Sequence, residues 1–571
     1  MPRKLLLREI KNIKWQRNLS TSTVTRKSDE YVIKSPLPDI VVPKMRFHDR
    51  LWMNSASFRN HVALESAENK KTYTYAQLQK HIPVFATSLL KKLGLKPKDV
   101  VAVMLPNMPE FSVVAYGTLQ AGCVLTTINP IYKELELGHQ ITITEPRVIV
   151  TIPECYETVA KATKNFKSPI KVVLIDEPSK PVPNKTIRYS EIAESGEADH
   201  DMLDRIENKP EDIACIPFSS GTTGLPKGVE ITYGNLLAAI ETMHTDETCY
   251  PFLTHGDNQD ILPSFLPFYH IYGFVIGMTG HLAKGCKLKT MSKFSASLYL
   301  DILKNERSSL LYIVPPVAIL LGKHPDVTEQ HFRDVRHIIC GAAPLAGSDV
   351  DAILEKSKRD IEFNQGFGAT ETTSLCTSTY KGTRDVDFSA CGMPMAGIEL
   401  KFADPVTGEP VPIGQAGEMY VKGQNIMKGY HKNPKATEES LTKDGYFKTG
   451  DLGYFKPGVG LFITDRIKEL IKVKGMQVAP AELESILRSH PSVQDAAVIG
   501  VPHEFFGEAP KAFIIRKKTT DGQKTTEEEL QDFVSSQVAV YKKIEEVMFV
   551  EEIPKTASGK ILRKELKKMY A

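Results

Sequence analysis

A glycine-rich loop that carries hydroxyl groups and one cation is the part of the sequence whose residue types most clearly suggest chemistry. Residues 219–228 read SSGTTGLPKG. Glycine lets backbone N–H groups turn toward an anion, the hydroxyls add hydrogen-bond donors, and Lys227 adds a compact positive charge. The pattern predicts a phosphate-binding loop that follows a strand over residues 213–218. Taken alone, an ordinary turn between two strands is the commoner interpretation of such a loop.

The length and composition indicate a multidomain globular chain without a polyanion-binding signature. The 571 residues exceed what one ordinary core accommodates, so two or more domains are expected. With 25% charged residues and a net charge of +3, nucleic acid is not an expected partner. The eight cysteines form no C-x-x-C pair, which favours a reducing compartment and no structural zinc. Two apolar stretches, residues 261–283 and 310–322, are interrupted by proline, so no transmembrane segment is predicted.

The first 28 residues combine eight lysines and arginines with one acid, Glu9, and are rich in serine and threonine toward their end. This composition resembles a mitochondrial transit peptide and favours the mitochondrial matrix. A disordered basic tail, or an amphipathic helix in peripheral contact with an anionic membrane, is the alternative, and a cytoplasmic location goes with it. The last residues, Met569–Ala571, do not form the S-K-L peroxisomal signal.

Hydrophobic patterning predicts an α/β protein with a distinct C-terminal domain. Between residues 100 and 320, apolar runs of strand length alternate with amphipathic helical patterns, as expected of layered, parallel α/β subdomains. After Gly392, short strands separated by Gly/Pro turns predict a small β-rich subdomain. The last hundred residues begin with a helix that has Pro480 in its first turn, and strands follow it, which predicts a separate α+β domain.

Five further loops combine glycine turns with polar groups. They are Gly341–Leu345, Gln365–Thr372, Lys448–Asp451, Asp465–Glu469 and Pro554–Lys560. In this order, and together with SSGTTGLPKG, the set resembles the adenylate-forming superfamily of acyl-CoA synthetases, peptide-synthetase adenylation domains and firefly-type luciferases. Val478–Glu484 and Gly559–Arg563 make the chain look most like the coumarate:CoA ligases. The resemblance implies an AMP-binding domain over residues 29–466 and a mobile C-terminal domain over residues 467–571.

The resemblance also implies the activity of an AMP-forming acid:CoA ligase. Such an enzyme activates a carboxylic acid with ATP and Mg²⁺, releases pyrophosphate, and passes the acyl group from AMP to the thiol of CoA. Because the carboxylate and the α-phosphate are both anionic, the transition state needs cations where charge accumulates. By resemblance Lys560 is the catalytic lysine of this step, Thr370 contacts the AMP phosphate, and Glu371 binds the magnesium ion.

A larger set of residues would bind the nucleotide by the same resemblance. The glycine-rich loop would hold the β- and γ-phosphates through Ser219, Ser220, Gly221, Thr222, Thr223, Gly224 and Lys227. Asp451 would accept hydrogen bonds from the ribose hydroxyls, and Arg466 would add a guanidinium to the same region. The adenine would lie against Gly341, Ala342, Gln365, Gly366 and Phe367. Any one of these residues, taken alone, is also compatible with a satisfied core or turn position.

The resemblance implies an apolar pocket for the acid, with His270 orienting the carboxylate. A lone histidine among apolar residues is more often a hydrogen-bonded core group. The expected walls of the pocket are Tyr269, Tyr272, Gly273, Phe274, Ser374 and Leu375, together with Gly341 and Gly366. Ile271 stands where amino-acid adenylating relatives place an aspartate, so an α-amino acid is disfavoured. Aliphatic chains and aromatic propenoates fit this pocket about equally, and a fatty acid is the first expectation because a mitochondrial address suits it.

Two half-reactions require two arrangements of the C-terminal domain, because Lys560 would block the path of the CoA thiol. Lys468 falls at the family's hinge. Rotation there would withdraw Lys560 and bring in Lys472, Gly475 and Gln477 near the pantetheine arm of CoA.

Three other functions share some of these features. A luciferase-like oxygenase has the same motifs, an adenylation module could serve a separate carrier protein, and a non-catalytic protein could bind nucleotide. Every charged position that catalysis requires is occupied, which favours the CoA ligase.

Overall fold

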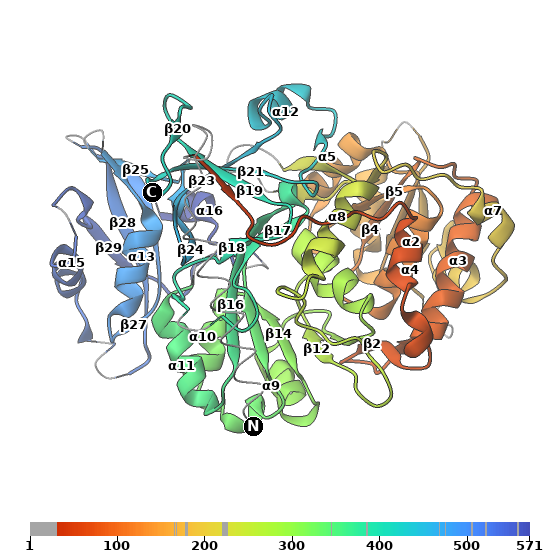
Figure 1. The fold of residues 1–571 in the computed structure, drawn as a ribbon, viewed down its shortest axis with the longest axis horizontal. Helices are drawn as coiled ribbons and strands as arrows, with labels where there is room; N and C mark the ends of the chain where they lie inside the picture. Colours follow the sequence, from red (N-terminus) through yellow and green to blue (C-terminus); the bar gives the residue numbers. More distant parts are fainter. Residues whose placement is uncertain are drawn as a thin grey trace.

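The computed structural model describes residues 31–164, 166, 168–176, 181–219, 226–343, 345–383, 386–467, 469–473, 476–503, 506–519, 522, 524–538, 540–556 and 559–570. Of Met476 and Gln477 only the backbone is described. The targeting segment predicted over residues 1–28 lies outside these ranges, so the mitochondrial location stays a prediction. Figure 1 shows the chain passing from an α/β region, through a central unit and a β-rich unit, to a C-terminal unit on the opposite side.

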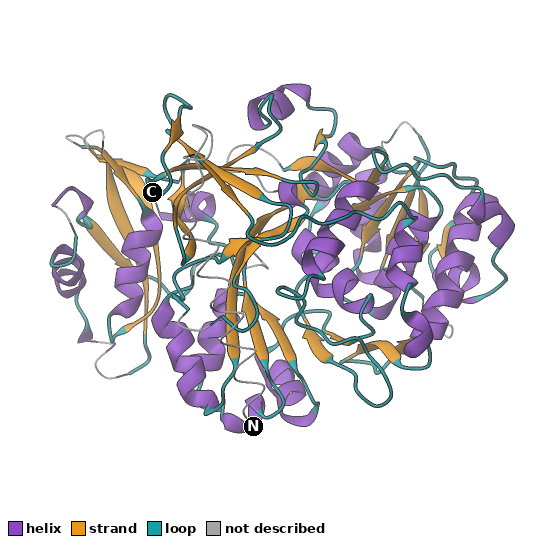
Figure 2. Ribbon diagram, in the orientation of Figure 1, coloured by secondary structure: helices purple, strands orange, loops and turns teal. Residues whose placement is uncertain are grey.

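The first α/β region is built on a sheet of order β10-β11-β9-β5-β4-β6-β7-β8, with β22 beside β11. Its strands are β4 (Val100–Met104), β5 (Val124–Thr127), β6 (Val148–Thr151), β7 (Lys171–Leu174), β8 (Thr186–Arg188), β9 (Ile213–Cys215), β10 (Phe218–Ser219), β11 (Lys227–Thr232) and β22 (Gly429–Tyr430). Helices surround these strands in the right half of the view (Figure 2). They are α2 (Phe47–Trp52), α3 (Tyr75–Lys91), α4 (Pro109–Gln120), α5 (Glu134–Thr144), α6 (Tyr156–Thr163), α7 (His200–Asp204) and α8 (Tyr233–Met243).

The parallel strands β4 to β7 are apolar and largely buried, as expected of a sheet covered on both faces, whereas the edge strand β8 is half-buried. The strand predicted over residues 213–218 is divided in two in the structure. β9 ends at Cys215 and β10 begins at Phe218, with Pro217 between them. Proline has no N–H to donate to a sheet, so it interrupts the predicted strand.

Two smaller sheets complete the central part of the molecule. One has the order β12-β13-β2-β3, with β12 (Ile261–Ser264), β13 (Lys287–Thr290), β2 (Val62–Ser66) and β3 (Thr72–Thr74). The other has the order β14-β15-β16-β17-β18, with β14 (Leu310–Ile313), β15 (His337–Cys340), β16 (Glu362–Ala369), β17 (Ser374–Ser378) and β18 (Met393–Pro394). The accompanying helices are α9 (Ala296–Asn305), α10 (Pro315–Lys323) and α11 (Gly347–Ser357). Short helical turns are η2 (Ser55–Ser57), η3 (Pro153–Cys155), η4 (Ser190–Glu194), η5 (Tyr272–Gly280), η6 (Glu329–Phe332) and η7 (Thr370–Thr372).

The apolar stretches that could be mistaken for membrane spans fold as these short elements. Residues 261–283 contain β12 and the π-helical turn η5, and residues 310–322 contain β14 and most of α10. Among the described residues, no helix is both long enough and apolar enough to cross a bilayer.

The β-rich unit predicted after Gly392 is an antiparallel sheet of order β1-β19-β21-β23-β24, with β20 beside β19. Its strands are β1 (Val32–Lys34), β19 (Glu399–Ala403), β20 (Pro410–Val411), β21 (Gly417–Lys422), β23 (Phe447–Lys456) and β24 (Gly460–Arg466), and α12 (Pro434–Ser440) lies before β23. β24 ends at Arg466, the residue at which the sequence analysis divides the two domains.

The C-terminal unit has its own sheet and its own apolar core. The sheet comprises β25 (Ile471–Val473), β26 (Met476–Val478), β27 (Val493–His503), β28 (Gly507–Arg516) and β29 (Glu546–Phe549). The helices are α13 (Pro480–Ser489), α15 (Glu527–Ser535), the turn η8 (Val540–Lys542) and α16 (Arg563–Tyr570). Leu483, Val498 and Ile514 are fully buried in a core that is separate from the main one. The predicted fold class, a large layered α/β domain with a β-rich subdomain and a smaller α+β domain, is confirmed.

The π-helical turn η5 supplies a test of the packing. A methyl group at Gly273 would lie 2.0 Å from the carbonyl oxygen of Pro267, whereas at Gly277 the nearest atom would be 3.7 Å away. We therefore expect Gly273→Ala to lower the free energy of unfolding by about 2–3 kcal/mol, because backbone must move to relieve the clash. Gly277→Ala, buried in the same turn, should leave the melting temperature nearly unchanged. Equal melting temperatures of the two variants would contradict this packing.

Candidate functional site

Three cavities meet where the loop after β15 faces the end of β16. The large cavity has a volume of about 600 Å³, the interface cavity about 180 Å³ and the inner cavity about 60 Å³. Ala342 and Gly368 line all three. The carboxyl ends of the parallel strands β14 and β15 lead to this point, which is where open α/β sheets commonly bind ligands.

The backbone at the junction adopts conformations that few side chains permit. Ala342 has a φ of 76°, in the left-handed region, although it is not a glycine. A methyl group on Gly368 would lie 1.9 Å from the carbonyl oxygen of Ser374, so only glycine fits there. Strained backbone of this kind persists where the surrounding structure holds it, and it is concentrated at functional sites.

One end of the large cavity gathers groups suited to phosphate and a divalent cation. Ser219 and Lys227 are paired across β10 and β11, and the buried hydroxyl of Ser219 has no hydrogen-bond partner among the described residues. The ammonium of Lys227 lies 4.7 Å from the ring centre of Tyr430. The Tyr430 hydroxyl donates a 2.9 Å hydrogen bond to Oε1 of Glu371, a carboxylate that is 8% exposed. Burial, followed by the Glu371 charge, raises the pKa of Tyr430, so this hydroxyl stays a donor.

Asp451 and Arg466 form an ion pair at another part of the large cavity. They face each other across β23 and β24, and the Arg466 Nε lies 3.0 Å from Oδ1 of Asp451. Burial raises the pKa of Asp451, while the positive charges of Arg466 and Lys560 oppose that shift. A carboxylate held in this way can accept hydrogen bonds from a sugar diol.

Lys560 reaches the same region from the C-terminal unit. The N–H of Lys560 donates to the Thr556 hydroxyl at 3.0 Å, and the Thr556 N–H donates to the Lys560 carbonyl at 2.8 Å, which closes a tight turn. Gly559, with a φ of 82°, lies so close to Pro316 that a methyl group would approach its Cδ to 2.8 Å. Burial and the nearby Arg466 lower the pKa of Lys560 to about 8. The lysine lines both the large and the interface cavity.

His270 lies where the large and inner cavities adjoin. Its Nδ1 accepts a 3.2 Å hydrogen bond from the N–H of Tyr272, and burial lowers its pKa to about 4. The ring is therefore neutral near pH 7 and carries its proton on Nε2. A neutral hydrogen-bond donor at this junction can orient the carboxylate of the acid. Because it carries no charge, it leaves the electrostatic stabilisation of the phosphates to the cations.

The structure brings most of the residues predicted for the site to the three cavities. The large cavity is lined by Ser219, Lys227, Tyr269, His270, Thr370, Glu371, Asp451, Arg466 and Lys560. The interface cavity is lined by Gln365, Gly366 and Phe367, among others. The inner cavity is lined by Tyr272, Gly341, Ser374 and Leu375, among others.

Several predicted residues are not brought to the site. Gly273 and Phe274 lie behind Tyr272 in η5 and line none of the three cavities. Lys472, which is expected at the site only after the predicted rotation, is exposed on β25, and its N–H donates to Glu508 at 2.8 Å. Outside the described residues lie Ser220, Gly221, Thr222, Thr223, Gly224, Lys468, Gly475 and the side chain of Gln477.

The sequence analysis missed Tyr430, Glu469 and Arg563. Tyr430 stands in a short strand with no motif around it, and it reaches Glu371 only because β22 pairs with β11. Glu469 and Arg563 both lie in recognised loops, but their 2.6 Å ion pair joins positions that are far apart in the sequence. For Glu469 and Arg563, the signal available in the sequence was that both are charged residues within loops that match the family's motifs.

The chain matches two known families. Residues 51–431 match the family described as AMP-binding enzyme, and residues 482–560 match the AMP-binding enzyme C-terminal domain. The chain therefore belongs to the AMP-binding enzyme family, and the predicted resemblance is confirmed.

Relatives and solved structures agree with this assignment. "4-coumarate--CoA ligase 1" of Solanum tuberosum is 36% identical over 555 residues, which cover 96% of this chain and 98% of the relative. "4-coumarate--CoA ligase 1" of Arabidopsis thaliana is 34% identical over 548 residues, 95% of this chain and 96% of the relative. ATP-bound MatB from Rhodopseudomonas palustris superposes with a TM-score of 0.79 at 27% identity, covering 92% of this chain and 99% of that one. The protein is an AMP-forming acid–thiol ligase that uses ATP, Mg²⁺ and CoA.

The residues present fit these cofactors. The unpartnered Ser219 hydroxyl and Lys227 suit a phosphate group, and the Glu371 carboxylate supplies the hard oxygen ligand that magnesium prefers. Magnesium commonly binds through one or two carboxylates together with substrate phosphates, so a single buried carboxylate is sufficient. When bound, the ion would neutralise phosphate charge.

Lys560 can be tested through the adenylation step. We expect Lys560→Ala to slow acyl-AMP formation on the order of 100-fold or more, because one preorganised cation is lost at the reacting phosphate. In the unchanged enzyme, kcat/KM for this step should fall as pH rises through about 8, where Lys560 loses its proton. Pyrophosphate release at pH 6 to 9 measures both effects. Lys564→Ala, at an exposed position on α16, is the control, and similar rates in the two variants would contradict the assignment.

Tyr430 can be tested through the magnesium requirement. Tyr430→Phe keeps the ring beside Lys227 but removes the hydrogen bond to Glu371. We expect the magnesium concentration for half-maximal activity to rise by about 10-fold, as is typical when a ligand loses its orienting partner. Tyr454→Phe is the control, since Tyr454 stacks on Phe462 and lines none of the three cavities. An unchanged magnesium requirement would show that Glu371 needs no orienting donor.

Proposed function

We propose that the acid activated by this ligase is an aromatic propenoate, whose planar ring enters the inner cavity. The observation that carries this proposal is the lining of that cavity. Tyrosines contribute much of its wall: Tyr250, Tyr272 and Tyr312. The remaining walls include Met243, Ile276, Leu375 and Met395. Flat aromatic walls favour a flat aromatic ligand.

A long-chain fatty acid fits this cavity less well. The flat aromatic walls of the inner cavity match a planar ring better than a flexible alkyl chain. The sequence-based preference for a fatty acid depended on a mitochondrial address that lies outside the described residues. The names of the relatives also favour an aromatic propenoate, since they are called 4-coumarate–CoA ligases.

Tyr272 offers a means of recognising a substituted ring. Its hydroxyl is buried, has no hydrogen-bond partner among the described residues, and lies next to Gly341 in the cavity wall. An unpaired buried hydroxyl is costly, so a substrate oxygen that pairs with it is favoured over a ring that lacks one. A hydroxyl group on the aromatic ring is such a partner.

The arrangement supports a two-step reaction. With His270 orienting it, a carboxylate oxygen of the acid attacks the α-phosphorus of ATP and pyrophosphate leaves, while Lys560 stabilises the negative charge on the phosphate oxygens. Asp451 and Arg466 hold the ribose end in place. In the second step the CoA thiol attacks the acyl carbonyl, loses its proton, and displaces AMP. The apolar walls of the inner cavity exclude water from the mixed anhydride between the two steps.

The substrate is tested by thioester formation with a panel of acids. We expect 4-coumarate and cinnamate to give higher kcat/KM than octanoate or palmitate. In Tyr272→Phe, the preference for 4-coumarate over cinnamate should fall by about three- to ten-fold, the value of one hydrogen bond. Mass spectrometry of the acyl-CoA products measures these ratios.

Tyr299→Phe is a matched control. Tyr299 is also a buried tyrosine with an unpartnered hydroxyl, but it packs against Phe265 and Phe294, away from the three cavities. It should leave the acid preference unchanged. Faster thioester formation with palmitate than with any aryl acid would overturn the proposed substrate while leaving the ligase activity intact.

A further inference from the structure

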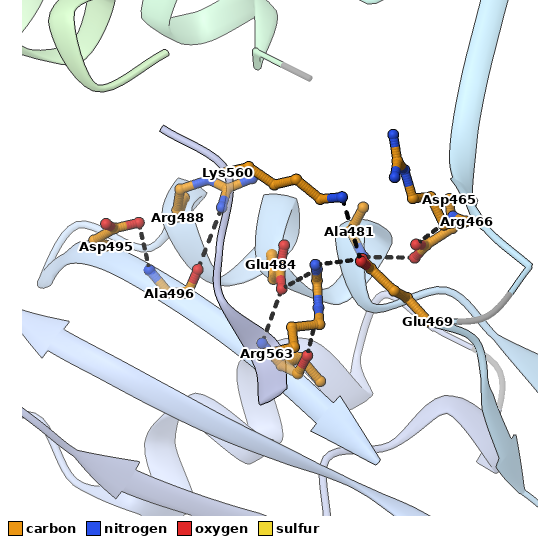
Figure 3. Close-up of polar contacts among 11 residues, drawn as sticks. Asp465, Arg466, Glu469, Ala481, Glu484, Arg488, Asp495, Ala496, Lys560 and Arg563 are labelled. Carbon is orange, nitrogen blue, oxygen red and sulfur yellow. Dashed lines mark hydrogen bonds and ion pairs between the residues drawn. The ribbon is translucent and has the colours of Figure 1, made fainter. Parts of the chain in front are cut away.

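Two cations of the C-terminal unit converge on one carboxylate. Figure 3 shows Lys560 and Arg563 both directed at Glu469. The Arg563 Nη1 lies 2.6 Å from Oε2 of Glu469, and the Lys560 Nζ lies 3.9 Å from Oε1. Arg563 therefore makes a charge-assisted hydrogen bond to Glu469, whereas Lys560 forms an ion pair with it that is too long for a hydrogen bond. Glu469 is thus held by Arg563, and Lys560 stays free to turn toward a phosphate.

Arg563 is itself fixed on its other side. Its second terminal nitrogen lies 2.7 Å from Oε1 of Glu484, and its Nε donates to the carbonyl of Val498 at 3.2 Å. Oε1 of Glu484 also accepts a 2.9 Å hydrogen bond from the Val498 N–H. The side chain of Glu484 is only 4% exposed, and that of Arg563 is 14% exposed. This closed, buried set of contacts gives the Glu469 carboxylate a defined place.

The position of these residues along the chain determines which of them move together. Glu469, Glu484, Lys560 and Arg563 all follow the predicted hinge at Lys468, whereas Asp451 and Arg466 precede it. Rotation at the hinge would separate Lys560 from Asp451 and Arg466 but would leave its pairing with Glu469 intact. Glu469 is therefore the carboxylate that accompanies Lys560 in both arrangements.

We infer that Glu469 is a positioning residue: it is a counter-ion that moves together with Lys560 and keeps the lysine's ammonium charged for the adenylation step. Arg563 holds Glu469 in place. The inference rests on the role proposed above for Lys560. A buried ammonium tends to lose its proton, and a carboxylate nearby opposes that loss. Glu469 reaches Lys560 without a hydrogen bond, so it supplies charge and does not compete strongly with the incoming phosphate.

The charges around Lys560 come from four elements. Arg466, at the end of β24, and Arg563, at the start of α16, lower the pKa of Lys560. Asp451 on β23 and Glu469 before β25 raise it. Among the described residues, Glu469 is the carboxylate that pairs with the Lys560 ammonium, at 3.9 Å, so its removal acts most directly on the lysine.

The test is the pH profile of adenylation in Glu469→Gln. We expect the alkaline limb of the profile to move to lower pH by about 0.5–1 unit, because the stabilising negative charge is lost. Pyrophosphate release should fall about two- to five-fold at pH 8 and change by less than two-fold at pH 6. Glu469→Asp keeps the negative charge, so the alkaline limb of its pH profile should lie close to that of the unchanged enzyme. Thioester formation from preformed acyl-AMP and CoA should be unaffected, since Lys560 is withdrawn in that step.

The matched control is Glu482→Gln. Glu482 lies on α13 in the same unit and pairs at the surface with Lys542, so this variant makes the same charge change away from Lys560. The pKa of Lys560 is also measured directly, by the pH dependence of its labelling with acetic anhydride followed by mass spectrometry, which needs no catalytic activity. In Glu469→Gln the pH midpoint of labelling should fall by about the same amount as the alkaline limb of the activity profile.

The outcomes separate this inference from the role of Lys560 itself. If Lys560→Ala keeps normal adenylation, the proposed catalytic role fails, and the inference fails with it. If Lys560→Ala is inactive but Glu469→Gln has the profile and labelling midpoint of the unchanged enzyme, only the counter-ion role is overturned. Equal loss of both half-reactions in Glu469→Gln at every pH would instead indicate a general structural role.

Discussion

The site is governed by the repulsion between a carboxylate and a polyphosphate that must meet in a partly buried space. Positive charge has to come from the protein, and it comes from three separate parts of the fold. Lys227 stands at the start of β11, Arg466 at the end of β24, and Lys560 in a turn of the C-terminal unit. Each is accompanied by an acceptor or an aromatic face: Tyr430, Asp451 and Glu469 respectively. These partners restrain the cations until the anionic ligands arrive.

This distribution explains why so many small sheets surround one point. A single sheet cannot aim charges at one phosphate from several directions, whereas three sheets that end near Ala342 and Gly368 can. The close approach of β16 to β17 leaves no room for a side chain at Gly368, and the left-handed backbone at Ala342 turns the chain away after β15. Local strain at the junction is the cost of bringing acid, nucleotide and lysine to the same place.

The fold class and the loops that line the cavities could be predicted from the sequence, because strand periodicity and glycine-rich motifs are local signals. The pairings between distant positions could not. Tyr430 contacts Glu371 only through the β11–β22 pairing, and Arg563 meets Glu469 only when α16 packs against β27. The walls of the inner cavity were predicted in part: Tyr272 and Leu375 line it, but Gly273 is turned against Pro267, since the π-helical geometry of η5 alters which residues face inward. The choice of acid depends on that packing.

The residues on the deep wall of the inner cavity determine how the acid specificity of such a protein can change during evolution. Met243, Tyr250, Ile276, Tyr312 and Met395 line the inner cavity and neither of the other two. Mutations at these positions alter the shape presented to the acid without touching any group that handles ATP or carries Lys560. Natural selection, or a protein engineer, can therefore exchange one carboxylic acid for another in small steps, each of which retains a working activation machinery.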